Sequence, residues 1–171
     1  FIINGNEKVI VAQEKIAENK IYVFESTKNS KYSHICEIKS VSMVGFNTPK
    51  NVSVRLLTRD NSYGRCIRVN IPHVKVDVPL FIIFKALGIT SDKEIISYIV
   101  HDINREDSSM LNWLRPNVEE ASHIKTQEEA LEYLLKNGII LGQPKDIKLD
   151  KVKKLKIFKG MLGRDFLCHV G

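Results

Sequence analysis

The chain has 171 residues and a mass of 19.5 kDa; 43% of the residues are apolar and 27% are charged. This size and balance suit one globular domain, or one domain with a fragment of another, and exclude collagen-like, low-complexity and wholly disordered proteins. The longest apolar runs are far too short to span a membrane, so no membrane partner is expected. The three cysteines support neither a disulfide framework nor a zinc ribbon, which favours a reducing, intracellular compartment.

The net charge of +6 is unevenly distributed along the chain. Residues 21–75 carry a net +6, residues 76–144 a net −5, and residues 145–171 a net +5. Basic regions of this kind favour contact with phosphate groups or with acidic proteins. Solubility alone explains an excess of basic residues equally well, so both interpretations stay open.

Strand-like patterns occupy the first half of the chain. Gly5 and Asn6 predict a tight hairpin turn. Four further short segments are rich in β-formers or alternate between apolar and polar residues: 21–24, 34–38, 52–56 and 67–71. The last two flank a turn-rich loop, so we expect them to pair as a hairpin. Arg55 and Arg68 would then share the face opposite to the apolar side chains and form a small basic surface on the sheet.

The second half of the chain has helical periodicity. Helices are predicted in five segments: 80–87, 92–100, 110–114, 126–137 and 150–159. Ser91 and Thr126 each open a capping box, and Pro116 is expected to end the third helix. The last helix is lysine-rich; we expect Val152 to face the core and Gly160 to terminate the helix. Strands followed by helices predict an α+β fold, with antiparallel strands in the first half and helices packed on them in the second.

The sequence lacks the motifs of common catalytic and metal sites. Its five histidines form no HExxH pair, and the glycine patterns of phosphate loops, dinucleotide-binding loops and nucleophile elbows are missing. It has no Asp-x-Asp cluster to hold Mg²⁺ for nucleotidyl transfer. The adjacent Cys168 and His169 have no evident third group to orient them as nucleophile and base. A self-contained nucleotidyltransferase is therefore disfavoured.

Two basic features near the C-terminus permit a nucleic-acid interpretation. Residues 159–164 contain a Gly-x-x-Gly flanked by basic residues, similar to the phosphate-clamping loop of KH domains, but the order of elements is wrong for that fold. The seven lysines between residues 145 and 159 could follow a phosphate backbone. A solvated helix face is the favoured interpretation, because interleaved aromatic residues for base stacking are missing apart from Phe158.

Several stretches resemble one protein family. Residues 1–14 are similar to the FIING-x-E-[KR]-V-x-x-x-Q motif of the second-largest, β-type subunit of multisubunit RNA polymerases, and residues 71–89 resemble its LP…K-x-DIP…IIFRALGI run. Shorter matches follow in the same order: 114–116, 118–120, 129–131, 137–138 and 166–171. Cys168 stands where the family usually has proline. The resemblance covers essentially the whole chain, and we expect the chain to be a piece of a longer polypeptide.

The resemblance implies a place in the enzyme. Residues 1–14 would form the end of the protrusion and residues 15–171 the lobe, which together line one side of the DNA cleft. The family's Mg²⁺ is held mainly by the largest subunit, which implies no cofactor and no catalytic residue in this segment, and no activity of the segment alone. Lys8 and Gln13 match the motif residues that lie near the DNA–RNA hybrid, where a cation would contact phosphate without reading sequence. A solubilising role for Lys8 stays equally open.

Partners and location also follow from the resemblance. The implied partners are the largest subunit, a small zinc-ribbon subunit, an initiation factor, template DNA and the DNA–RNA hybrid. Arg55, Arg68 and the lysine-rich tail are candidates for either protein docking or contact with downstream DNA. The motifs favour a nuclear polymerase II-like enzyme, and a large-DNA-virus version in infected cytoplasm or virions fits equally well. The archaeal and bacterial versions of the motifs fit less well. The alternative from another class is a free-standing basic module of similar fold that binds nucleic acid or protein.

Overall fold

The computed structural model describes residues 2–7, 9, 17–27, 30–45, 48–100, 108–138 and 150–170. The first element is a small hairpin of β1 (Ile2–Ile3) and β2 (Asn6–Glu7). Its turn lies at Asn4 and Gly5, whose φ angles are 52° and 75°. Two successive positive φ angles are typical of a type I′ turn, which an Asn-Gly pair favours. The predicted hairpin is therefore present, but its turn begins one residue earlier than predicted.

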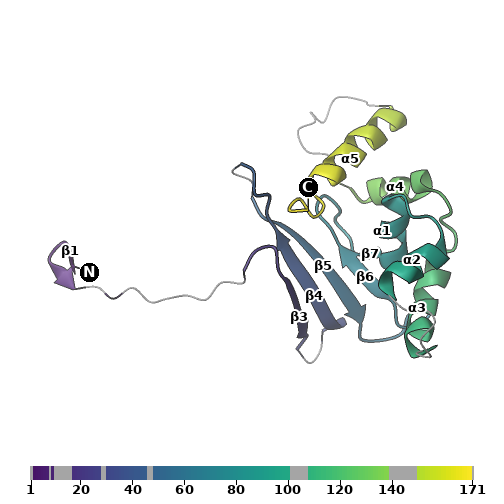
Figure 1. Ribbon diagram of the computed structural model, residues 1–171, viewed down its shortest axis with the longest axis horizontal. Helices are drawn as coiled ribbons and strands as arrows, with labels where there is room; N and C mark the ends of the chain where they lie inside the picture. The colour runs from purple at the N-terminus through teal and green to yellow at the C-terminus, as the bar shows by residue number, and fades with distance from the viewer. Residues whose placement is uncertain are drawn as a thin grey trace.

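A five-stranded antiparallel sheet forms the first layer of the main body (Figure 1). Its strands follow the order β3-β4-β5-β6-β7 and comprise β3 (Ile21–Glu25), β4 (Tyr32–Ser40), β5 (Lys50–Leu57), β6 (Ile67–Asn70) and β7 (Val78–Pro79). The predicted hairpin of β5 and β6 is present, with Arg55 directly opposite Arg68. Sequence analysis missed β7, because two residues are too few to show a period.

Five helices form a second layer on one side of the sheet (Figure 1). They are α1 (Leu80–Ala86), α2 (Asp92–Ile99), α3 (Ser108–Glu120), α4 (Gln127–Lys136) and α5 (Lys151–Asp165). One hydrophobic cluster joins Val52 and Val69 of the sheet to residues of the helices, including Phe81, Leu134 and Phe158. The predicted α+β class is confirmed, with the strands in the first half of the chain and the helices in the second.

The central helix, α1, buries a charge as well as an apolar surface. Phe81 and Ile82 are fully buried, as the almost continuous apolar run predicts. Lys85 is also buried; its Nζ donates hydrogen bonds to the carbonyl oxygens of Ala121 at 2.9 Å and Ile124 at 2.7 Å. These carbonyls follow the end of α3, where helices leave acceptors without partners, so the ammonium group caps that turn.

Helix α3 continues through Pro116, contrary to the prediction that it would end there. The ring of Pro116 lies against the β5–β6 loop at Gly64, where an added Cβ would come within 2.8 Å of Pro116 Cγ. The next residue, Asn117, is buried and accepts a hydrogen bond at 2.8 Å from the backbone N–H of Ile67 in β6. Tertiary contacts with the sheet therefore offset the hydrogen bond that proline cannot donate.

The helix starts and α5 differ from the predictions in detail. Thr126 caps α4, accepting from the N–H of Glu129 at 3.2 Å, whereas Ser91 makes no side-chain cap to α2. Helix α5 does not end at Gly160 but runs on to Asp165, so its Gly-x-x-Gly is helical and not a phosphate-clamping loop. Val152 is 70% exposed and not in the core, whereas Phe158, further along the same helix, is fully buried.

Polar contacts at two places hold the C-terminal part of the described chain: one at His73, between β6 and β7, and one at Ser40 of β4. Asp165 at the end of α5 pairs with His73, which lies between β6 and β7 with a positive φ of 67°. Further on, His169 Nδ1 lies 2.6 Å from Oγ of the buried Ser40 in β4, and Cys168 Sγ lies 3.4 Å from the same oxygen. The adjacent Cys168 and His169 thus both meet a serine hydroxyl and anchor the chain end to the sheet.

The contact between α4 and α5 gives a stability prediction. A Cβ on Gly138 would lie only 2.6 Å from Cε2 of the buried Phe158, so Gly138→Ala should force α5 outward and lower the free energy of unfolding by about 1–3 kcal/mol. Gly160→Ala is the matched control, since a Cβ there meets nothing within 4 Å. Alanine favours helix, so that variant should be unchanged or up to about 1 kcal/mol more stable. Urea unfolding of both variants measures this; equal stabilities would contradict the packing described.

Candidate nucleic-acid and protein interface

The two arginines predicted to form a basic surface lie side by side on the sheet face opposite to the one that joins the main hydrophobic cluster. They are opposite each other across β5 and β6, and Val54 and Val69, one residue away from them, turn to the helix side. However, the side chains of Arg55 and Arg68 are only 28% and 17% exposed. The prediction of a shared face is confirmed, but this is not an open basic patch.

Arg55 belongs to a polar cluster around Asp77. Its Nη1 lies 3.6 Å from Asp77 Oδ1, and its guanidinium lies 5.4 Å from the ring centroid of Tyr32. The hydroxyl of Tyr32 donates a hydrogen bond to Asp77 Oδ2, and Asn70 Nδ2 donates to Oδ1 at 3.2 Å. The carboxylate therefore lies at the centre of the cluster and offsets the charge of Arg55.

The same cluster shifts two pKa values in opposite directions. Burial, followed by the hydrogen bond to Asp77, raises the pKa of Tyr32 to about 12. Burial alone would raise the pKa of Asp77, but the hydrogen bonds from Tyr32 and Asn70 and the charge of Arg55 outweigh it and lower that pKa below its ordinary value. At neutral pH the hydroxyl stays protonated and the carboxylate ionised, so the donor and the acceptor are matched.

Arg68 is held by Glu120 at the C-terminal end of α3. Two guanidinium nitrogens contact the two carboxylate oxygens, at 2.8 Å and 2.5 Å, in the bidentate geometry that arginine favours. Burial, together with Glu120, also raises the pKa of the neighbouring Cys66 to about 11, so that its thiol is protonated and unreactive at neutral pH. Both predicted arginines therefore have an acidic partner.

Two basic side chains without an ion-pair partner in the described ranges lie beside them, in the loops. A hollow of about 830 Å³ is lined by Lys31, Arg59 and Arg68, together with Leu57 and uncharged polar side chains. Lys31 Nζ lies 5.5 Å from the centroid of the Tyr32 ring, on which it packs. Neither Lys31 nor Arg59 forms an ion pair within the described part of the chain. Sequence analysis missed both, because single charges in turns carry no periodic signal.

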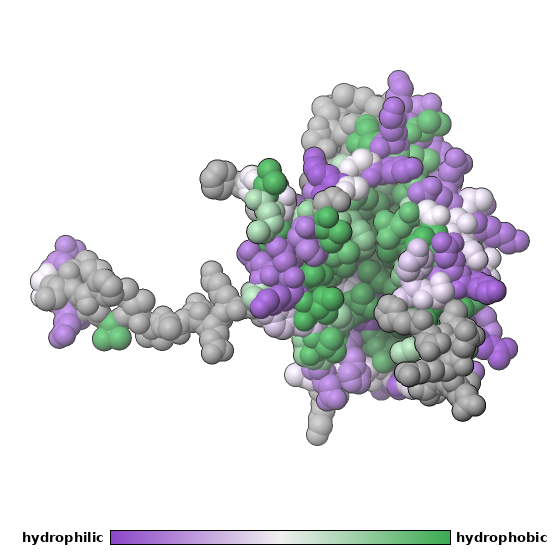
Figure 2. Space-filling model, in the orientation of Figure 1, coloured by the Kyte–Doolittle hydropathy of each residue, from purple (hydrophilic) through white to green (hydrophobic). Residues whose placement is uncertain are grey.

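The edge of the sheet formed by β3 carries exposed apolar side chains. Strand β3 pairs only with β4 in the described ranges, and Ile21 and Val23 are 70% and 69% exposed. Both lie on the helix side of the sheet, in register with Ile38 and Cys36, but beyond the reach of the helices. Figure 2 shows apolar surface between the strands and the helical layer. Exposed apolar side chains on an edge strand are typical of a protein interaction surface.

The remaining candidate residues divide between the two ends of the chain. Lys8 and Gln13 lie outside the described residues, so their role near a DNA–RNA hybrid stays a prediction. Of the lysines on α5, Lys151 is 3.1 Å from Glu132 of α4, whereas the others on that helix have no acidic partner in the described ranges: Lys153, Lys154, Lys156 and Lys159. Helix α5 therefore presents a second, separate basic surface.

The described ranges contain neither a candidate metal site nor a membrane-spanning helix. No three His, Cys, Asp or Glu side chains lie close enough together there to hold a metal ion. Among the same residues, no helix is both long and apolar enough to cross a membrane.

Comparison with known proteins identifies the family. The family described as RNA polymerase Rpb2, domain 2 matches residues 17–171. The chain belongs to the Rpb2 domain 2 family. Over the whole chain it is 37% identical to DNA-directed RNA polymerase II subunit 2 of Arabidopsis thaliana, and over 99% of the chain 40% identical to subunit RPB2 of Eremothecium gossypii. The archaeal subunit Rpo2 of Sulfolobus acidocaldarius is 32% identical over the whole chain.

These similarities confirm the family resemblance seen in the sequence motifs. The eukaryotic polymerase II relatives are more similar than the archaeal ones, as the wording of the motifs indicated. The chain spans only 13–14% of the length of these relatives. The chain therefore matches one segment of these much longer subunits.

The Asp77 cluster predicts an acid-sensitive contribution to stability. Because the pKa of Asp77 is lower in the folded than in the unfolded chain, its contribution is complete above its ordinary pKa of 3.8 and is lost as the pH falls through the folded value. Asp77→Asn should lower the free energy of unfolding by about 1.5–3 kcal/mol at pH 7, and the difference from wild type should shrink below pH ~4.

Urea unfolding between pH 2.5 and 7 measures this difference. Asp60→Asn is the control, because Asp60 lies in the exposed loop after β5 and should leave the pH profile unchanged. A difference between Asp77→Asn and wild type that stays constant over this pH range would contradict the assignment.

Proposed function

We propose that the chain is the lobe-bearing segment of the second-largest subunit of a DNA-directed RNA polymerase of the nuclear polymerase II type. Residues 1–14 then end the protrusion, and residues 15–171 form the lobe. The observation that carries the proposal is the similarity to polymerase II subunits over essentially the entire chain, at 37–40% identity. No observation favours a free-standing module, because each of these relatives contains the match within a much longer polypeptide.

In this proposal the segment supports DNA-templated RNA synthesis as part of the wall of the DNA cleft. The Mg²⁺ of nucleotidyl transfer requires a cluster of carboxylates, and the described residues do not fit that requirement. The segment's own contribution is a rigid surface: the sheet face that carries Arg55 and Arg68 is fixed by internal ion pairs, and the loops beside it carry free cations. Such a surface favours phosphate contacts that position DNA without reading its sequence.

The DNA-facing residues in this proposal are Lys31 and Arg59. They line one hollow, and neither forms an ion pair with a described acid, which distinguishes them from Arg55 and Arg68. Lys8 and Gln13 remain the proposed contacts for the DNA–RNA hybrid on the strength of the motif resemblance.

Other polymerase subunits are the proposed protein partners. The largest subunit, a small zinc-ribbon subunit and an initiation factor are the candidates, and the exposed apolar side chains of β3 supply a surface of the kind that protein partners cover. The polymerase II relatives favour a nuclear location.

Purification of the parent protein tests the assignment. An affinity-tagged full-length parent should co-purify with a largest polymerase subunit, and the complex should incorporate nucleotides on a DNA template with Mg²⁺. The isolated 171-residue chain should give no incorporation under the same conditions. A parent protein that purifies alone, or an isolated chain that synthesises RNA, would refute the proposal.

Charge reversal tests the assignment of the DNA-facing residues. In the assembled polymerase, Lys31→Glu with Arg59→Glu should weaken DNA retention and reduce the slope of log affinity against log salt by about 1 per lost phosphate contact. The matched control is Lys93→Glu with Lys125→Glu, which makes the same charge change at exposed positions on α2 and before α4. Equal effects of the two pairs would mean that only net charge matters and would overturn the assignment.

A further inference from the structure

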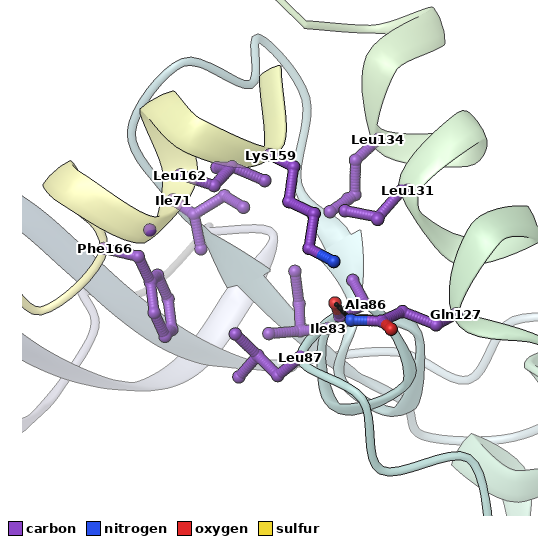
Figure 3. Close-up of a pocket in the computed structure, with 11 residues that line it drawn as sticks. Ile71, Ile83, Ala86, Leu87, Gln127, Leu131, Leu134, Lys159, Leu162 and Phe166 are labelled. Atoms are coloured by element: carbon purple, nitrogen blue, oxygen red, sulfur yellow. Dashed lines mark hydrogen bonds between the residues drawn. The ribbon is translucent and has the colours of Figure 1, made fainter. Parts of the chain in front are cut away.

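A second pocket lies within the helical layer, away from the hollow that Lys31 and Arg59 line. It has a volume of about 270 Å³ and lies between α1, α4 and α5 (Figure 3). Its walls are apolar, formed by side chains such as Leu87, Leu131, Leu162 and Phe166. Leu87 is more than half exposed, so the pocket is open to solvent on that side. Pockets for drug-sized ligands are usually ~300–1,000 Å³, which makes this one better suited to a single large side chain.

One cation extends into this apolar pocket. Figure 3 shows the amino group of Lys159 between Leu131 and Leu134 on one side and Gln127 and Ala86 on the other. No ion pair to Lys159 is formed within the described ranges, whereas Lys151, two turns earlier on the same helix, has one. Lys159 is exposed as a residue, so its ammonium group is available to pair with an anionic group of a ligand at the pocket.

Polar and backbone features complete the pocket. Gln127 Nε2 donates to the carbonyl oxygen of Ala86 at 3.1 Å, which fixes the side chain at the pocket wall. Gly163 contributes to the lining without a side chain, and a Cβ there would meet nothing within 4 Å. This open wall leaves room for a ligand side chain next to Lys159.

The charge around the pocket selects the kind of occupant. Lys153, Lys154, Lys156 and Lys159 lie on α5 with no described acidic partner, whereas the acid at the end of α5, Asp165, is already paired with His73 and Arg164. A ligand that places an apolar side chain in the pocket would therefore have the unpaired charge of Lys159 beside it. Acidic flanks are favoured there and basic flanks are disfavoured.

We propose that this pocket binds an acidic peptide segment of a partner protein, with one leucine or phenylalanine inserted between α1, α4 and α5 and an adjacent carboxylate paired with Lys159. The pocket is built entirely by this chain, so the proposal does not depend on the assignment of the DNA-facing surface. It assigns to α5 a role in protein recognition, in contrast to the phosphate contacts proposed for Lys31 and Arg59.

Fluorescence anisotropy with the fluorescein-labelled peptide SDDLFDDS, added to the assembled complex of the full-length parent, tests the proposal. Binding is expected, and it should weaken by about tenfold or more when the peptide is changed to SDDAADDS or SKKLFKKS, since either change removes one of the two matched features. Failure of SDDLFDDS to bind, or equal binding of the three peptides, would overturn the proposal.

Two pairs of variants separate the pocket from general charge effects. Lys159→Glu should weaken binding of SDDLFDDS by about tenfold or more, and Lys153→Glu, the same change outside the pocket lining, by less than about threefold. Gly163→Met should fill the pocket and abolish binding, whereas Gly160→Met should not, because both positions have open space but only Gly163 lines the pocket. Equal effects within either pair would refute the assignment.

A nucleic-acid occupant would give a different result. If a labelled DNA duplex competes with the peptide and its binding is also lost in Lys159→Glu, the pocket belongs to a nucleic-acid surface and the peptide proposal is wrong. None of these variants should change co-purification with the largest subunit, so failure here is distinguishable from failure of the polymerase assignment.

Discussion

The buried ammonium group of Lys85 is the constraint on which the arrangement of the helices depends. A buried cation without partners would cost several kcal/mol, and this one is satisfied only when three parts of the chain meet. It lies on α1, donates to the carbonyls of Ala121 and Ile124 after α3, and lies 3.4 Å from Asp92 at the start of α2. These contacts fix the end of α3.

The position of α3 in turn determines the electrostatics of the sheet. Glu120, the last residue of α3, reaches Arg68 because the end of that helix is fixed beside β6. Asp77, immediately before β7, offsets Arg55. The two arginines are thereby used inside the fold, whereas Lys31 and Arg59 in the loops and four lysines of α5 form no ion pair in the described ranges. These are the cations on which the two proposed surfaces depend: one for phosphate beside the sheet and one for an acidic peptide at the helices.

Local patterns in the sequence predicted much of the fold and less of the candidate sites. Composition rich in β-formers located β3 and β4, and alternation of apolar and polar residues located β5 and β6. The alternation also placed Arg55 and Arg68 on one face, because a period of two fixes which residues share a face. The same reasoning could not predict that both arginines are neutralised, since Asp77 and Glu120 come from distant parts of the chain. It also ended α3 at Pro116, where contact with Gly64 overrides the usual effect of proline. Lys31, Arg59 and the Lys159 pocket depend on loops and helix packing, for which no local pattern exists.

The contact between Gly64 and Pro116 has a mechanical consequence. The loop that carries Arg59 is joined to α3 at its far end, through a backbone position with a φ of +127° that leaves no room for a side chain. Arg59 therefore does not lie on a freely swinging arm: a force applied to the loop by a bound polyanion is transmitted to α3, and through the turn held by Lys85 to the centre of the helical layer. If the proposed contact of Arg59 with DNA is correct, this coupling would hold the arginine in place against the pull of the moving polymer.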